Sequence, residues 1–171
     1  CCLTSGYCVA SFLNGTHMKA ILTFHSIDDR GTVLSFPPAT FARMIEEILE
    51  GGVKICSLDQ LLCPETDNAL TITFDDGMRS VYENALPILK DANVPSHLYL
   101  TTGVVGRTNN WPTQPTGAPA FDMMNWQELE ACVDAGMKIE SHTVSHPNLC
   151  QLGQQQIEEE CETADLSIEK Q

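Results

Sequence analysis

The segment TITFDDG, residues 71–77, carries a predicted strand directly into two adjacent carboxylates. Together with the two apolar residues before it, the segment gives an alternating run at 69–74 that is typical of a strand with a buried face. Asp75, Asp76 and Gly77 follow at once. Asp-Gly is ordinary turn chemistry, so a simple turn is one interpretation. The other is a functional site. Two neighbouring carboxylates repel each other, and a nearby positive charge such as a bound cation would offset that repulsion.

Strands and helices alternate on both sides of this segment. The pattern predicts strands at 19–24, 53–58, 69–74, 96–102 and 137–142, and helices at 41–52, 80–92, 126–136 and 154–170. Pro87 should kink the second helix or mark a late start. Asn125 and Glu128 have the spacing of a capping box for the third. This β/α order favours a parallel sheet with helical crossovers, and a long loop occupies 103–124.

The chain is shorter than a complete parallel barrel requires. Parallel β/α units close into barrels or form open doubly wound sheets, and a full (β/α)8 barrel takes about 250 residues. The chain has 171 residues and ends within a helical pattern. We therefore predict an α/β fold that is a barrel cut short at its C-terminus. Residues 1–18 are expected to form an N-terminal tail, and residues 19–171 the N-terminal part of the barrel domain.

Charge and hydropathy exclude several classes of partner. The formal net charge is -14, which argues against nucleic acid and against anionic lipid, because both require clustered Lys and Arg. No apolar run is long enough to span a bilayer, so membrane insertion is not expected. No signal peptide is visible, and the chain does not begin with Met.

The eight cysteines carry little information about function. They include no C-x-x-C pair, which argues against a cysteine zinc site. Buried free thiols are favoured over disulfides, although the sequence leaves both open. The triplet at 14–16 matches an N-glycosylation acceptor, a pattern that is also common by chance.

Polar residues cluster where the predicted strands end, which is where parallel α/β folds place their sites. These residues are His25, Asp75, Asp76, Thr101, Thr102, His142 and His146. One carboxylate and two histidines make a metal site with open positions. In that interpretation one Asp binds the cation and its neighbour stays free to act as a base. A chance His-x-x-x-His pair and a structural His25 remain alternatives.

Two motifs resemble those of a known family. TFDDG (73–77) and SHTVSHP (141–147) are similar to the first two motifs of the polysaccharide deacetylases, the NodB-homology carbohydrate esterases. NALPIL (84–89), TTG (101–103) and the segment 123–149 agree with that family, and the similarity covers residues 19–170. The resemblance implies a distorted (β/α) barrel that removes N- or O-acetyl groups from sugars with a divalent metal.

The resemblance assigns roles to individual residues. The metal ligands would be Asp76, His142 and His146, and Asp75 would be the general base. LTFHSIDD (22–29) further resembles deacetylases of poly-N-acetylglucosamine, in which a histidine after the first strand is the general acid, here His25. Thr101 and Trp111 are expected to contact the substrate.

The resemblance also implies the cofactor, the substrate and the location. The metal is expected to be zinc, with nickel, cobalt or iron as alternatives. The substrate would be a glycan that contains N-acetylglucosamine, and the protein would be secreted, periplasmic or in the cell envelope. The exact glycan, N- versus O-deacetylation and the oligomeric state are not set by the sequence.

The later motifs of the family do not appear in this chain. One alternative is therefore a truncated, non-catalytic remnant that binds metal or carbohydrate, which a measurement of acetate release would distinguish from an enzyme. A non-haem iron oxygenase shares the ligand set. Those enzymes are all-β jelly rolls with a different ligand order, so the α/β pattern argues against this alternative.

Overall fold

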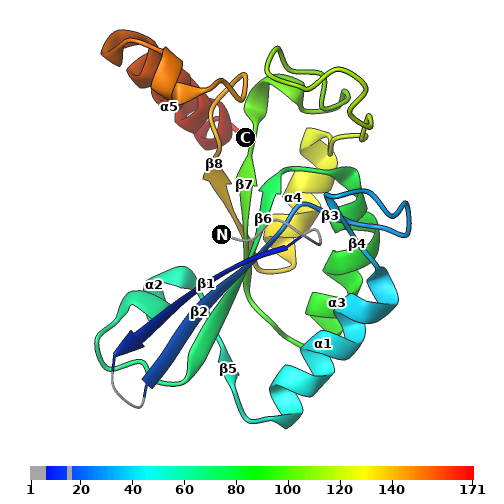
Figure 1. Cartoon of the computed structure of the whole chain (residues 1–171), viewed down its shortest axis with the longest axis vertical. Coiled ribbons are helices and arrows are strands. Elements are labelled where there is room, and N and C mark those ends of the chain that lie inside the picture. Colours follow the sequence, from blue (N-terminus) through cyan, green and yellow to red (C-terminus); the bar gives the residue numbers. More distant parts are fainter. Residues whose placement is uncertain (1–6, 15–16) are drawn as a thin grey trace.

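The computed structural model describes residues 7–14 and 17–171, and its central element is a twisted sheet (Figure 1). The strands lie in the order β1 (Tyr7–Asn14), β2 (His17–Phe24), β6 (Ala69–Asp76), β7 (Ser96–Leu100) and β8 (Met137–Ser141), and β5 (Lys54–Ile55) also pairs with β6. β1 is antiparallel to β2 and all the other pairs of this sheet are parallel. The carboxyl ends of β6, β7 and β8 therefore meet at one edge.

The helices follow the predicted alternation. They are α1 (Pro38–Glu50), α2 (Leu58–Leu62), α3 (Leu86–Asp91), α4 (Trp126–Asp134) and α5 (Gln154–Glu169), with short π or 3-10 turns η1 (Val81–Ala85), η2 (Thr102–Val104) and η3 (Leu149–Gln151). In Figure 1, α1, α3 and α4 lie on one side of the sheet and α5 lies beyond the end of β8. Among the described helices, none combines the length and the apolar character needed to cross a bilayer.

The predicted fold class is confirmed, and the sheet is open. Within the described residues β8 pairs only with β7, so it forms one border of the sheet and the barrel does not close. A separate two-stranded sheet joins β3 (Ser26–Ile27) to β4 (Ser35–Phe36). Four elements were not predicted: α2, β1, β3 and β4. Three of them, α2, β3 and β4, are five residues or shorter, which is too short for a clear periodic pattern.

The expectation of an N-terminal tail at 1–18 is wrong for the described residues 7–14 and 17–18, which belong to strands. Residues 7–14 form β1, which pairs with β2 along its whole length, from Tyr7 against Phe24 to Asn14 against His17. In YCVASFLN apolar residues occupy both odd and even positions, so the sequence has no clear period of two. Pairing with the neighbouring strand decides the conformation here.

Some sequence features lie wholly or partly outside the described residues. Cys1, Cys2 and part of the glycosylation triplet at 14–16 are among them. The cysteines from Cys56 onward are free thiols, of which Cys56 and Cys132 are buried. Cys63 and Cys150 are exposed, which differs from the expectation of buried thiols.

The main core lies between the sheet and the helices α1, α3 and α4. Three aromatic rings form its centre: Phe24 of β2 lies 5.3 Å from Phe41 of α1 and 6.0 Å from Phe74 of β6, centroid to centroid. β6 is buried along almost all of its length, as expected for a parallel strand that is covered on both faces. This packing fixes the strand that ends on Asp75 and Asp76.

Pro87 distorts a helix, and the late start that was the other possibility is not seen. The chain is helical from 79 to 91, with the π turn η1 directly before α3. α3 begins at Leu86, with Pro87 in its first turn. Proline has no N–H, and its ring collides with the carbonyl four residues earlier in a regular helix. The preceding turn η1 is widened, and the Leu86 N–H donates to the carbonyl of Val81, five residues back.

The predicted capping box of α4 is confirmed, and it supports a stability prediction. The Glu128 N–H donates to the Asn125 side chain at 3.0 Å, and the Asn125 N–H donates to the Glu128 carboxylate at 2.9 Å. Asn125→Ala should lower the free energy of unfolding by about 1 kcal/mol, because an N–H of the first turn loses its acceptor. Asn125→Asp is the control, since it keeps an acceptor. Equal urea midpoints for the Ala variant and the unsubstituted chain would contradict the prediction.

Candidate metal centre

Asp76, His142 and His146 converge on one point at the carboxyl edge of the sheet. The Nε2 atoms of His142 and His146 lie 3.6 Å and 3.5 Å from the same carboxylate oxygen, Asp76 Oδ1. The candidate ligand atoms of the three residues all lie within 4.8 Å of one another. Asp76 ends β6, and the two histidines follow β8, so the parallel pairing of the sheet brings them together.

This group fits a small divalent cation. Asp76 Oδ1 is buried and, among the described residues, receives no hydrogen bond, which is costly for a carboxylate oxygen. Two ligands at ~2.0–2.1 Å from a tetrahedral zinc lie about 3.3 Å apart. The observed separations of 3.5 and 3.6 Å come close to that value. A bound cation would supply the missing partner of the oxygen.

A tight turn explains how a strand can bring two carboxylates to one place. Side chains alternate along a strand, so Asp75 and Asp76 would otherwise point to opposite faces. The Gly77 N–H instead donates to the Asp75 carbonyl at 3.0 Å, and Asp76 between them has φ 74°. This is the geometry of a strained γ-turn, and a non-glycine residue in such a conformation costs roughly 1–3 kcal/mol. Strain of this kind is typical of functional sites.

Gly77 is required at the exit of this turn. Its φ is 96°, and a Cβ atom there would lie 2.6 Å from Leu100 Cδ1. Glycine therefore meets both a conformational and a steric need. The Asp-Asp-Gly sequence is a turn and part of a site at once.

The electrostatics suit metal binding and base catalysis. Burial, and then the charge of Asp76, raise the pKa of Asp75 to about 7. Burial raises the pKa of Asp76 to about 6. Burial, and then the charges of His146 and His25, lower the pKa of His142 to about 4. Burial likewise lowers the pKa of His146. Both imidazoles are therefore neutral near pH 7, which is the form that binds metals.

The structure places His25 beside Asp75. His25 follows β2, and its Nε2 lies 4.0 Å from Asp75 Oδ2, on the same edge of the sheet as the candidate metal ligands. The side chain is about one-fifth exposed. Burial, and then the charge of His146, lower its pKa.

Thr101 was expected to contact the substrate, but its side chain is not at the surface. Its side chain is fully buried, so in this structure it offers no surface to a substrate. Its N–H donates to the Asp76 carbonyl at 3.2 Å, and its hydroxyl donates to the His142 carbonyl at 3.4 Å. Thr101 therefore joins the ends of β6 and β8, which carry the candidate metal ligands.

Trp111 packs on a candidate metal ligand, His146. Its ring lies 4.5 Å from the His146 ring, centroid to centroid, at an angle of 30°. From the same 103–124 loop, the Thr113 hydroxyl donates to the His146 carbonyl at 2.8 Å. The loop therefore covers and orients His146, a role that its Gly- and Pro-rich sequence did not predict.

Thr143 is a further residue that sequence reasoning missed. Its hydroxyl accepts a hydrogen bond from the His146 N–H at 3.1 Å and so shapes the loop between the two histidines. A threonine three residues before an N–H is a known local motif, so the spacing in SHTVSH could have indicated it.

Comparison with known proteins agrees with this geometry. The family model described as polysaccharide deacetylase matches residues 64–171, which is more than half of the chain. YxkH of Bacillus subtilis (strain 168), whose name assigns it to the polysaccharide deacetylases, is 24% identical over 146 residues, covering 82% of this chain and 47% of that protein. The poly-beta-1,6-N-acetyl-D-glucosamine N-deacetylase of Staphylococcus aureus (strain MRSA252) is 35% identical over 79 residues, covering 46% of this chain and 24% of the enzyme.

The fold has a solved counterpart. The Streptococcus pyogenes deacetylase PplD, solved in complex with acetate, superposes with a TM-score of 0.73 at 22% identity, covering 88% of this chain and 67% of that one. The chain spans less than half the length of the two curated relatives. A parallel sheet with this site at its carboxyl edge and a family match over 64–171 lead to one conclusion. The chain belongs to the polysaccharide deacetylase family.

Proposed function

We propose that this chain, β1 included, is part of a metal-dependent hydrolase that removes N-acetyl groups from a glycan containing N-acetylglucosamine. The observation that carries the proposal is the convergence of Asp76, His142 and His146, with Asp75 directly beside them. The named activity of the S. aureus relative supports the choice of substrate. The net charge of -14 is compatible with a product that carries a free, cationic amine.

The metal is proposed to be zinc, held by Asp76, His142 and His146. Two imidazoles and one carboxylate suit zinc, while nickel, cobalt and iron accept the same donors. When bound, such a cation supplies a Lewis acid that polarises a carbonyl and lowers the pKa of water. We further propose that the protein acts outside the cytoplasm or in the cell envelope, where such glycans occur.

Asp75 is proposed as the general base. In the metal-free chain its pKa is about 7. A cation bound beside it would favour the ionised carboxylate, which is the form that takes a proton. Asp75 removes a proton from the water that attacks the acetyl carbonyl. The C–N bond then breaks, the acetyl group leaves as acetate, and the amine nitrogen receives the proton.

His25 is proposed to deliver that proton to the amine. Its pKa is lowered, so the ring is neutral at the start and acts as an acid only after it receives a proton. Asp75 Oδ2 lies 4.0 Å from His25 Nε2, so the two side chains would have to move closer, to hydrogen-bond distance, before Asp75 passes the proton on. His25→Gln should slow acetate release by about 10²-fold, the low end for general acid–base groups, because solvent that reaches the ring can partly replace it. An undiminished rate in this variant, with metal bound, would exclude the acid role.

Trp111 is retained as a proposed substrate contact. It lines a pocket with Arg107, Asn110 and Ser145, next to the loop that carries the metal ligands. Its side chain is buried and packs on His146, so little of its surface is available to a sugar.

Acetate release tests the proposed function directly. The chain is stripped with a chelator, reloaded with Zn²⁺, and incubated with a β-1,6-linked N-acetylglucosamine oligosaccharide. Acetate that appears only after reloading supports the proposal. Metal binding without acetate release would favour the non-catalytic remnant, and no metal binding would overturn the assignment of the site.

A further inference from the structure

The loop that carries both histidine ligands has an unusual backbone. Between His142 and His146 the chain includes Thr143 at φ 68°, and His146 itself has φ 51°. Non-glycine residues rarely adopt positive φ unless their surroundings impose it. The positions of the two imidazoles therefore depend on groups that hold this loop from outside.

One side of the loop is held by the segment after β7. The Thr102 N–H donates to the Thr143 carbonyl at 3.1 Å, and the Gly103 N–H donates to the Val144 carbonyl at 2.9 Å. A Cβ atom at position 103 would lie 2.5 Å from the Val144 carbonyl oxygen, so only glycine allows this approach. These contacts use the carbonyl groups of Thr143 and Val144. The N–H groups of Val144 and Ser145 bond to another partner.

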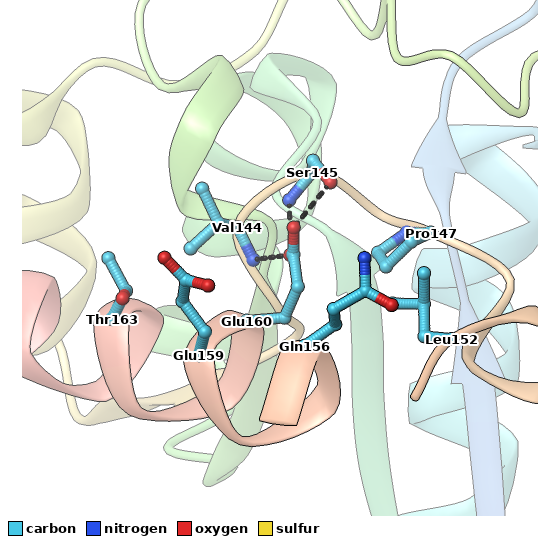
Figure 2. A pocket seen from close by; sticks show the side chains of 8 residues that line it. All are labelled: Val144, Ser145, Pro147, Leu152, Gln156, Glu159, Glu160 and Thr163. Atoms are coloured by element: carbon cyan, nitrogen blue, oxygen red, sulfur yellow. Dashed lines mark hydrogen bonds between the residues drawn. The ribbon is translucent and has the colours of Figure 1, made fainter. Parts of the chain in front are cut away.

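That partner is a single side chain of α5, Glu160. Its Oε2 accepts from the Val144 N–H at 2.9 Å and from the Ser145 N–H at 2.8 Å, and its Oε1 accepts from the Ser145 hydroxyl at 2.6 Å. Figure 2 shows the carboxylate turned into the loop, with the three bonds dashed. The side chain is only partly exposed, so these bonds are shielded in part from competing water.

The charge of Glu160 suits this task. Burial alone raises the pKa of a carboxyl group, but here the hydrogen bonds from Ser145 and Val144 outweigh it, and the pKa of Glu160 is lowered. An ionised carboxylate has only acceptors, which match the three donors. Hydrogen bonds to a charged acceptor are also roughly twice as strong as neutral ones.

We propose that Glu160 is a positioning residue for metal binding: it holds the Val144 and Ser145 N–H groups so that His142 and His146 face Asp76 together. This inference rests on the proposed function, because it presumes that the three residues bind a cation. The hydrogen bonds of Glu160 go to Val144 and Ser145 and not to the side chains of His142 and His146. Glu160 acts through the loop backbone, as groups beyond the direct ligands commonly do.

The test measures Zn²⁺ affinity of the full chain by titration, and the visible spectrum of the Co²⁺-loaded protein. Glu160→Ala should raise the Kd for Zn²⁺ about 10- to 100-fold, the usual effect of losing such a support. It should also change the Co²⁺ absorption bands, which report ligand geometry. Glu160→Gln should restore most of the affinity, because its amide oxygen can still accept from both N–H groups.

Glu159→Ala is the matched control. Glu159 is the neighbouring carboxylate on α5 and lines the same pocket, but it is exposed and is drawn in Figure 2 without a hydrogen bond. Its removal should leave the Kd and the Co²⁺ spectrum unchanged. If Glu160→Ala fails to fold, the Gln variant and Glu160→Asp, whose carboxylate is withdrawn by one methylene, provide the comparison.

The outcomes are distinct. Unsubstituted protein that binds no Zn²⁺ would overturn the proposed metal site itself. Unsubstituted protein that binds Zn²⁺ and a folded Glu160→Ala, or in its place Glu160→Asp, that binds it equally well would overturn the positioning role alone. A weaker Kd and an altered Co²⁺ spectrum, both absent in Glu159→Ala, would support it.

Discussion

Asp75→Asn should release acetate about 10²–10⁴ times more slowly than the unsubstituted chain, the usual cost of removing a general base. Asparagine has almost the same shape as aspartate but cannot take a proton from water. Asp75 is not among the three residues whose ligand atoms converge. Zn²⁺ affinity should therefore change little, and the measurements are the rate of acetate release and the Kd for Zn²⁺.

The stability of the Asp75→Asn variant gives an independent check. The pKa of Asp75 is raised to about 7 in the folded chain, so ionising this carboxyl costs stability as the pH rises above its unfolded value near 3.8. At pH 8 the metal-free variant should therefore melt no lower than the unsubstituted protein. Asp134→Asn, an exposed carboxylate at the end of α4, is the control for a simple change in charge.

Two results would contradict the role of Asp75. One is an Asp75→Asn variant that releases acetate at the unsubstituted rate. The other is a variant that loses Zn²⁺ as completely as Asp76→Asn does, which would make Asp75 a ligand and not a base.

The architecture was predictable because it depends on local and periodic signals. The β/α alternation follows from the period of each segment in turn. The helix distortion at Pro87 and the capping box at Asn125 each follow from spacing within one element. The rule that parallel strands place sites at their carboxyl ends then brought Asp76 and His142 together. No long-range contact had to be known for any of these steps.

What the sequence could not predict depends on contacts between distant segments. β1 forms because β2 lies beside it, and its own pattern is ambiguous. Trp111 packs on His146, which is 35 positions away, and Glu160 reaches Val144 across 16. Contacts between residues so far apart in the chain produce no helical or strand periodicity in the sequence. The buried position of Thr101 likewise follows from packing, which a rule about strand ends does not address.

Asp76→Asn should remove metal binding, with a rise in the Kd for Zn²⁺ of more than about 100-fold, because even supporting residues cost about 10- to 100-fold. Asparagine tolerates the φ of 74° at this position about as well as aspartate does, so the turn should survive. The variant loses the only carboxylate of the ligand group and the oxygen that both imidazoles face.

Thermal melting should show the loss of metal binding. With Zn²⁺, Asp76→Asn should melt at a lower temperature than the unsubstituted chain, and without Zn²⁺ it should not. A ligand present at 100 times its Kd stabilises the folded chain by about 2.7 kcal/mol, and a 100-fold rise in Kd reduces that to about 0.4 kcal/mol.

Without metal, Asp76→Asn should be at least as stable as the unsubstituted chain near pH 7, because it replaces a buried carboxylate whose pKa is raised to about 6. Asp75→Asn, which keeps the ligand group, should still gain stability from Zn²⁺. A metal-induced rise in melting temperature of normal size in Asp76→Asn would show that the cation binds elsewhere. If the metal-free Asp76→Asn variant melts much lower than the unsubstituted chain, Asp76 is needed for folding. The strained turn would then serve the packing of the chain and not the binding of a cation.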